Sequence, residues 1–141
     1  MKNDGLIIVL KKGINGVMFG TSVDDVVKQL GNPSEIEEIG EDIECPTTIL
    51  HYDQMGLSLF FDSNYETKLV CIDVDDPEVT LFDNKLIGKN PKEIVDIMVK
   101  NEIYNETMEE EDWGEKRISF EDYSIDFYFI DEKLVSITFG K

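Results

Sequence analysis

Side chains that could perform acid–base or nucleophilic chemistry are few in this sequence. His51 is the single histidine, and the two cysteines are Cys45 and Cys71. A cysteine–histidine enzyme needs a thiolate beside the imidazole, a third group that orients the ring and donors for an oxyanion. The spacing supplies one candidate thiol, on Cys71, and no Ser or Cys nucleophile with a triad layout around His51. We therefore predict no catalytic residues and no enzyme activity, and we interpret Cys45 as a loop thiol.

Carboxylates are abundant, but their spacing is not that of a metal site. The acidic runs EIEEIGEDIE (35–44) and ETMEEEDWGE (106–115) lack the alternating ligands and glycine of a calcium loop, as does DVDDPE (73–78). The cysteines have no zinc-like spacing, and no glycine-rich loop is present that could cradle a phosphate. We predict no metal and no cofactor.

The charge balance is strongly acidic and indicates the class of partner. The chain has 31 Asp and Glu against 13 Lys and Arg, a net charge of -18. Such a field repels nucleic acid and anionic membranes and attracts basic proteins, and no basic patch is present. We therefore expect no nucleic acid and no membrane partner. The alternative to a basic protein partner is an acidic surface that serves solubility alone.

The N-terminal region and the cysteine content predict a cytoplasmic protein. The apolar run Leu6–Leu10 is too short for a signal-peptide core, and no stretch approaches the roughly 20 apolar residues of a membrane span. Two cysteines without an export signal indicate reduced thiols.

Two stretches of the chain have the layout of a capped amphipathic helix, FGTSVDDVVKQLG (19–31) and IGKNPKEIVDIMV (87–99). Ser22 and Asn90 are predicted N-caps, each with an acidic residue three positions later. Apolar residues then recur with helical spacing on one face of each helix. The first helix is predicted to end at GNP (31–33), whereas the second lacks this stop and is expected to extend to about Tyr104.

Strand-like runs follow each helix after an acidic connection, and an offset of 68 residues relates the two sets without a gap from Gly20 to Phe61. The next turn is three residues shorter in the second half. The offset pairs apolar with apolar positions, and it predicts a repeat; the alternative is two unrelated helix-plus-hairpin units. The paired positions are Leu50–Ile118, Tyr52–Phe120, Leu57–Ile125, Leu59–Phe127, Phe61–Phe129, Val70–Val135, Ile72–Ile137 and Val74–Phe139.

The predicted fold is α+β, with two repeated units that each contain a helix and a three- to four-stranded antiparallel meander, at residues 1–76 and 77–141. One unit is too small to bury its apolar face, so the two should share one compact domain. Leading strands are expected at Leu6–Leu10 and Glu78–Gly88, the latter with a turn at Asp83–Asn84. The sequence leaves open whether the two sheets join into one.

Strand alternation separates a core face from a second face. The predicted core contains apolar residues of both helices and of one strand face: Val26, Leu30, Ile94, Met98, Leu57, Leu59, Phe61, Val70, Ile72, Val74, Ile125, Phe127, Phe129, Val135, Ile137 and Phe139. The second face carries His51, Ser58, Phe60, Cys71, Asp73, Arg117, Asp126, Tyr128, Ile130 and Ser136. Because Phe60 and Tyr128 are equivalent positions on a face that should be hydrated, we expect a partner surface there; a covering loop or a second copy of the chain would also explain them.

The helix-then-strands layout resembles the unit of the β-lactamase inhibitory protein family and of the small outer-membrane assembly lipoproteins of the BamE type. The residues that carry the resemblance are Phe19, Gly20, Ser22, Val26, Leu30, Gly31 and Pro33, and more weakly Ile87, Gly88, Asn90, Ile94 and Met98. The inhibitor family is a tandem repeat that binds a protein with a concave sheet face. The resemblance thus implies a similar architecture and, by analogy, a binding role.

These observations favour a non-enzymatic protein-binding module, in its most concrete form a cytoplasmic immunity or inhibitor protein that occludes a basic partner such as a toxin. The alternative is a small-molecule-binding protein or an enzyme with a pocket between the two units. The lipoprotein role is disfavoured by the lack of a lipidation signal. The sequence leaves the oligomeric state open. The predicted partner-binding residues are Phe60, Tyr128, Trp113, His51, Asp126, Asp73, Glu110 and Glu111.

Overall fold

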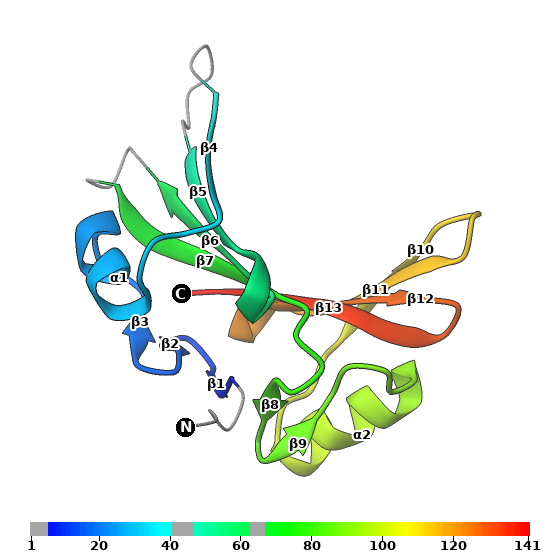
Figure 1. The fold of residues 1–141 in the computed structure, drawn as a ribbon. Coiled ribbons are helices and arrows are strands. Elements are labelled where there is room, and N and C mark those ends of the chain that lie inside the picture. Colours follow the sequence, from blue (N-terminus) through cyan, green and yellow to red (C-terminus); the bar gives the residue numbers. More distant parts are fainter. Residues whose placement is uncertain (1–5, 41–46, 63–66) are drawn as a thin grey trace.

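The computed structural model describes residues 6–40, 47–62 and 67–141, and its centre is one antiparallel sheet of eight strands (Figure 1). The strand order across the sheet is β10-β11-β12-β13-β7-β6-β5-β4. Their bounds are β4 (Glu35–Ile39), β5 (Thr47–Tyr52), β6 (Leu57–Asp62), β7 (Lys68–Val74), β10 (Thr107–Glu110), β11 (Glu115–Phe120), β12 (Ile125–Ile130) and β13 (Lys133–Gly140). With two α-helices beside this sheet, the structure confirms the α+β class.

The remaining elements are short and flank the sheet. They are the strands β1 (Ile8–Val9), β2 (Gly13–Ile14), β3 (Val17–Met18), β8 (Thr80–Leu81) and β9 (Asn84–Lys85), the helices α1 (Val23–Leu30) and α2 (Pro91–Lys100), and the 3-10 turns η1 (Asp53–Met55) and η3 (Glu121–Tyr123). The expected leading strand at Leu6–Leu10 is therefore only the short β1. The turn between β8 and β9 lies at Phe82 and Asp83, both with positive φ, and not at Asp83–Asn84.

Both helices begin at the predicted caps. The Asp25 amide donates to the Ser22 hydroxyl at 3.2 Å, and Asn90 and Glu93 form a reciprocal capping box. The expected extension of α2 to Tyr104 is wrong, because the helix ends at Lys100. Asn101 caps this end, and the Ile103 amide turns back to the Met98 carbonyl at 2.9 Å. Neither helix, nor any other in the described part of the chain, is long and apolar enough to cross a membrane.

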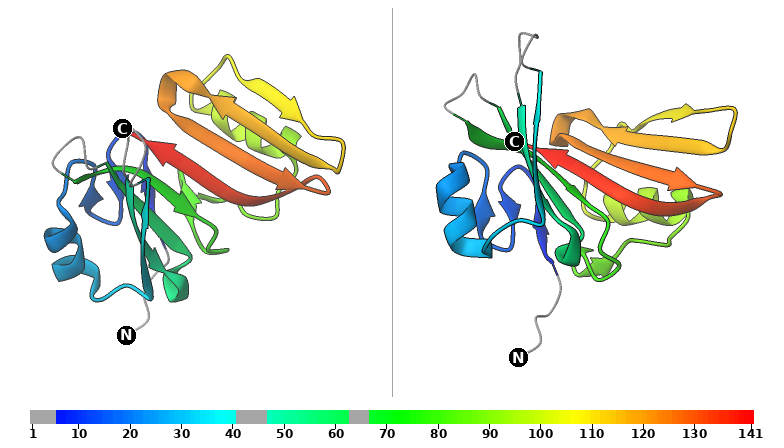
Figure 2. Two further views of the ribbon diagram at one scale, coloured as in Figure 1. Left: turned by 90° about the horizontal axis from the view of Figure 1, so that it is seen from above. Right: turned by 45° about the horizontal axis from the view of Figure 1, so that its top comes forward.

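The helices lie on one face of the eight-stranded sheet. Figure 1 and Figure 2 show α1 with β1–β3 against the β4–β7 half and α2 with β8–β9 against the β10–β13 half. Neither of these helices lies on the opposite face. The core lies between these layers and includes the apolar residues that the strand phase predicted, among them Leu59, Phe61, Phe127 and Phe129 at 0% exposure. Leu30 was predicted to be buried but is half-buried, because it is the last residue of α1.

Val70 and Val135 were predicted to face the core, and the structure places Leu69 and Leu134 there instead. A β-bulge shifts the register between Phe60 and Phe61, so that Phe60 pairs with Cys71 and Phe61 with Leu69. The same shift occurs on β12 and β13, where Tyr128 pairs with Ser136 and Phe129 with Leu134. The extra residue of a bulge reverses the alternation of side chains beyond it, and strict alternation cannot anticipate this.

The acidic runs that were expected to be connections contribute the two edge strands, β4 and β10. Glu35 pairs with His51, and Thr107 pairs with Ser119. These pairs relate β4 to β10 by 72 residues, although the strands beside them are related by 68. The ungapped offset is therefore wrong across this region, because the segment before β10 is longer and the hairpin after it is shorter. Residues 41–46, which include the end of the first run and Cys45, lie outside the described residues.

The two halves of the sheet join at β7 and β13, which answers the question that the sequence left open. Ile137 pairs with Val74, Thr138 with Asp73, and Phe139 with Ile72. In each half the order of main elements is helix, strand, strand, 3-10 turn, strand and strand. Equivalent backbone hydrogen bonds also recur, for example Gly20 N to Leu69 O at 2.9 Å and Gly88 N to Leu134 O at 2.8 Å.

Candidate partner-binding face

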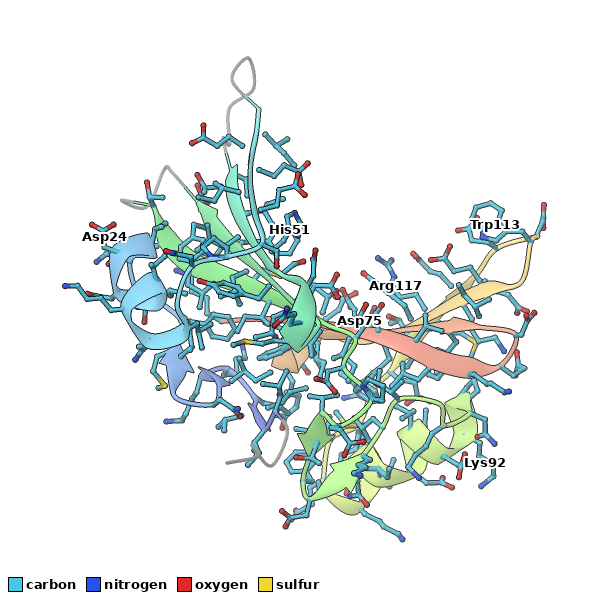
Figure 3. The ribbon with its side chains drawn as sticks, viewed as in Figure 1. Asp24, His51, Asp75, Lys92, Trp113 and Arg117 are labelled. Atoms are coloured by element: carbon cyan, nitrogen blue, oxygen red, sulfur yellow. The ribbon has the colours of Figure 1, made fainter. Side chains whose placement is uncertain are left out.

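We call the helix-free side of the eight-stranded sheet the open face. Residues directly opposite each other on neighbouring antiparallel strands point to the same side of a sheet, so the register assigns the side chains. The open-face residues in the middle of the sheet are Ile49, His51, Ser58, Phe60, Cys71, Asp73, Thr138, Ser136, Asp126, Tyr128, Arg117 and Ser119. Figure 3 shows His51, Arg117 and Trp113 on this side, with Asp24 and Lys92 on the helices opposite.

The centre of the open face is acidic and partly withdrawn from water. The Thr138 hydroxyl donates to Asp73 Oδ1 at 3.3 Å across the joint between β7 and β13. Burial raises the pKa of the Asp73 carboxyl, and the nearby Asp75 raises it further. Burial, with smaller effects of Asp73 and Asp126, raises the pKa of the Cys71 thiol to about 11. A cation at this position would therefore offset an unfavourable concentration of negative charge.

A shallow hollow of about 130 Å³ adjoins this centre. It is lined by Asp53, Gly56, Leu57, Ser58, Asp73 and Asp75. Within the described ranges, no group of three or more His, Cys, Asp or Glu residues has an arrangement that could hold a metal ion.

At the β4–β6 end of the open face, His51 connects three strands. His51 Nδ1 lies 2.8 Å from Ser58 Oγ, and His51 Nε2 lies 2.9 Å from Glu37 Oε1. Beside this chain, Ile49 is paired with Phe60 and is only 4% exposed, although it belongs to the open face. At this end Ile49 is therefore packed beneath its neighbours, next to the hydrogen-bonded side chains of Ser58, His51 and Glu37.

The hydrogen-bonded side chains of Ser58, His51 and Glu37 have the order of groups found in serine hydrolases. The sequence analysis placed Ser58 and His51 on the same face but predicted no serine with a triad layout around His51. Its surroundings do not suit acyl transfer, which needs donors aimed at a developing oxyanion. Ser58 lies in β6, a strand paired on both sides, and the hollow that it lines is acidic. A cysteine–histidine pair is disfavoured as well. Both ring nitrogens of His51 already have partners in Ser58 and Glu37, and the raised pKa of the Cys71 thiol disfavours a thiolate.

At the β10–β12 end, Arg117 occupies the position that Ile49 has at the other end. It forms an ion pair with Glu109 on β10. The hydrogen bond with Tyr128, together with the charges of Glu109 and Asp126, holds the pKa of the Arg117 guanidinium above its ordinary value. Trp113, in the β10–β11 hairpin, is 72% exposed, and its Nε1 donates to Glu115 Oε1 at 3.1 Å.

Most of the predicted partner-binding residues lie on or beside the open face. The face brings together His51, Phe60, Asp73, Asp126 and Tyr128, and Trp113 and Glu111 border it in a hollow with Tyr128.

Glu110 does not belong to this set, because it pairs with Lys116 and so faces the helix side of the sheet. The sequence reasoning missed Glu37, Glu109 and Ile49, because the acidic runs were treated as connections and not as strands. Alternation of side chains within those runs would have separated Glu109 and Glu111 from Glu110.

Comparison with known proteins establishes similarity of fold alone. No family model matches this chain, and no curated protein matches it in sequence. Its structure is similar to that of the uncharacterized protein YfeY from Escherichia coli, with a TM-score of 0.60 and 11% identity over 97% of this chain and 99% of that chain. It is also similar to an extracellular protein containing a SCP domain from Bacillus anthracis str. Ames, with a TM-score of 0.55 and 16% identity over 100% of this chain and 50% of that chain.

Proposed function

We propose that this chain is a non-enzymatic protein-binding module and that its open face binds a basic protein. The observation that carries the proposal is a face of the eight-stranded sheet that no described helix covers and on which half-buried aromatic side chains lie among carboxylates. One solvated face is common in antiparallel sheets, but monomeric proteins rarely expose large apolar patches, so aromatic side chains grouped on this face favour a partner. Phe60 and Tyr128 supply aromatic contact area of the kind that dominates binding energies, and Asp73 and Asp126 lie between them.

The proposal includes a tandem repeat, residues 1–76 and 77–141, as the architecture of the face. Two observations support it. Val70 and Val135 are the extra residues of equivalent bulges. The other lies where β7 pairs with β13: Ile72 is equivalent to Ile137, and Val74 is equivalent to Phe139. The pairs Ile137–Val74 and Phe139–Ile72 are therefore related by the same symmetry that relates the two halves. A face made of two related halves would resemble the concave binding face of the β-lactamase inhibitory proteins.

Binding would proceed by steering and then by contact. A net charge of -18 accelerates the encounter with a cationic protein, and the aromatic side chains then slow its dissociation. In the most concrete form of the proposal, the chain is a cytoplasmic immunity or inhibitor protein that blocks the active surface of a basic toxin by covering it. Inhibition by occlusion needs no catalytic residues.

The size of the hollows favours this function over a small-molecule site between the two halves. Four hollows among the described residues have volumes of about 120 to 260 Å³. Pockets for drug-sized ligands usually measure about 300–1,000 Å³ and enclose most of the ligand. A broad acidic face suits a protein surface better than it suits a small molecule.

The test begins with capture of the partner from the native host, or by co-purification with the product of an adjacent gene. We expect a basic protein whose association slows as salt is added, because the Debye length falls to about 10 Å at 0.1 M. Tyr128→Ala should mainly accelerate dissociation and cost about 2 kcal/mol of binding free energy. Tyr104→Ala is the matched control, because Tyr104 is 52% exposed and lies outside the eight-stranded sheet.

The proposed function fails if the captured partners are acidic or neutral, or if binding is indifferent to both salt and Tyr128→Ala.

A further inference from the structure

The hollow at the β10–β12 end of the open face is lined in part by an exposed aromatic side chain, that of Trp113. It has a volume of about 210 Å³ and is lined by Glu109, Glu111, Trp113, Glu115, Arg117 and Tyr128. Trp113 is the single tryptophan of the chain and is 72% exposed. Its hydrogen bond to Glu115 orients the indole, so that a ligand would meet a ring already held in place.

The charges around this hollow leave an excess of carboxylate. Arg117 is engaged by Glu109 through an ion pair and by Tyr128 through a hydrogen bond. Glu111 and Glu115 add two further carboxylates to the lining. A second cation would therefore be attracted by a net negative site with an aromatic wall, the arrangement that favours guanidinium and ammonium groups.

The corresponding place in the other half of the sheet has a different chemistry. The register Glu37–Ile49–Phe60 corresponds to Glu109–Arg117–Tyr128, so that an isoleucine stands where the second half has an arginine. Ile49 is 4% exposed beneath its neighbours. The two ends of the open face thus differ: one has the Arg117–Glu109 ion pair, and the other has a buried isoleucine beside His51 and Glu37. This difference would fix the orientation of a bound partner.

We infer that the hollow of Glu111, Trp113, Glu115 and Tyr128, here called the cation site, binds an arginine side chain of the partner. The guanidinium plane stacks on the Trp113 indole, and its N–H groups donate to the Glu111 and Glu115 carboxylates. Arginine suits the site better than lysine, because a planar donor fork can stack and pair with carboxylates together. The inference rests on the proposed function and adds the chemistry of one contact.

The test uses Trp113 as an internal fluorescent reporter in the full chain. The probe is the peptide acetyl-Gly-Arg-Arg-Gly-amide, compared with the same peptide carrying citrulline, a neutral isostere of arginine, in place of both arginines. We expect a saturable change of Trp113 fluorescence with the arginine peptide at low ionic strength, and none with the citrulline peptide. The change should weaken as salt is added.

Two charge-matched variants locate the binding. Glu111→Gln should weaken the affinity for the arginine peptide by about two- to fivefold, the range of an exposed ion pair. Glu110→Gln removes the same charge from the next residue, which faces the helix side, and should change the affinity much less. Equal effects of the two variants, an equal response to citrulline, or no saturable response to arginine would each overturn the cation site.

The outcome separates this inference from the proposed function. A basic partner whose binding requires Tyr128 but is insensitive to Glu111→Gln would refute the cation site and leave the proposed function standing. A cation site that binds the arginine peptide, in a chain that captures no basic protein, would refute the proposed function and support the site alone.

Discussion

Cys71 and Asp73 are neighbours on the open face, and both are partly withdrawn from water at the centre of the molecule. Cys71 is a free thiol, and its pKa is raised to about 11 by burial and by the carboxylates of Asp73 and Asp126. Only the thiolate reacts with alkylating agents. The alkylation rate of Cys71 and the effect of Asp73 on the pH dependence of stability therefore both measure the electrostatics of this face.

We predict slow alkylation of Cys71. In a Cys45→Ser variant, which leaves Cys71 as the single thiol, the rate with iodoacetamide at about pH 8 should be roughly a hundredfold below that of a free thiol of pKa about 8.5. Mass spectrometry over time measures this rate. Asp73→Asn should accelerate the reaction, because it removes one of the charges that raise the pKa. Reaction as fast as that of a free thiol would show that the face is hydrated.

Asp73 itself should make stability depend on pH. Its raised pKa means that the native state holds this proton more tightly than the unfolded state does, so its contribution to stability is fully present below the unfolded pKa of 3.8 and is lost as the pH rises through the native pKa. Asp73→Asn should consequently be more stable than the parent chain near pH 7, and this advantage should shrink toward pH about 3. Urea unfolding at both pH values tests the sign, and a loss of stability near pH 7 would contradict it.

At the level of elements, the strand phase of β6 and β12 determines which side chains build the core. Leu59 and Phe127 are 0% exposed between the sheet and the helices, whereas Ile130 on β12 is 49% exposed on the open face. Leu59→Ala or Phe127→Ala should each cost about 2–5 kcal/mol of unfolding free energy, because each leaves a cavity. Ile130→Ala is the apolar control and should cost less than about 0.5 kcal/mol. Denaturant unfolding measures all three, and a similar cost for Ile130 would mean that the open face is covered in solution.

At the level of the whole molecule, the excess of acidic side chains acts on stability as well as on partners. A net charge of -18 on a compact chain repels itself, and folding concentrates this charge. The melting temperature should rise as sodium chloride is added and should level off once the Debye length falls well below about 8 Å. A linear rise without a plateau would instead indicate a specific-salt effect on the hydrophobic core, and no rise would show that self-repulsion is negligible.

The sequence determined the parts of this protein that depend on local pattern. Ser22 and Asn90 cap the helices where the cap chemistry predicts. The alternation of β6 and β12 places Leu59 and Phe127 in the core, as the sequence analysis predicted. It also places Phe60 and Tyr128 on the other face. These features follow from the side-chain periods of the helix and the strand, which one segment carries by itself.

Only the tertiary structure decided the features that depend on pairing between distant segments. The two acidic runs, predicted to be connections, form edge strands, and Glu110 pairs with Lys116. Leu134, and not the predicted Val135, lies in the core. The tertiary structure also brought Ser58 to His51 and joined the halves of the sheet at β7 and β13. The physical reason is that backbone donors and acceptors are the same in almost every residue, so the pattern within one segment does not reveal its pairing partner or its bulges. These depend on how the apolar faces and turns of all the strands fit together.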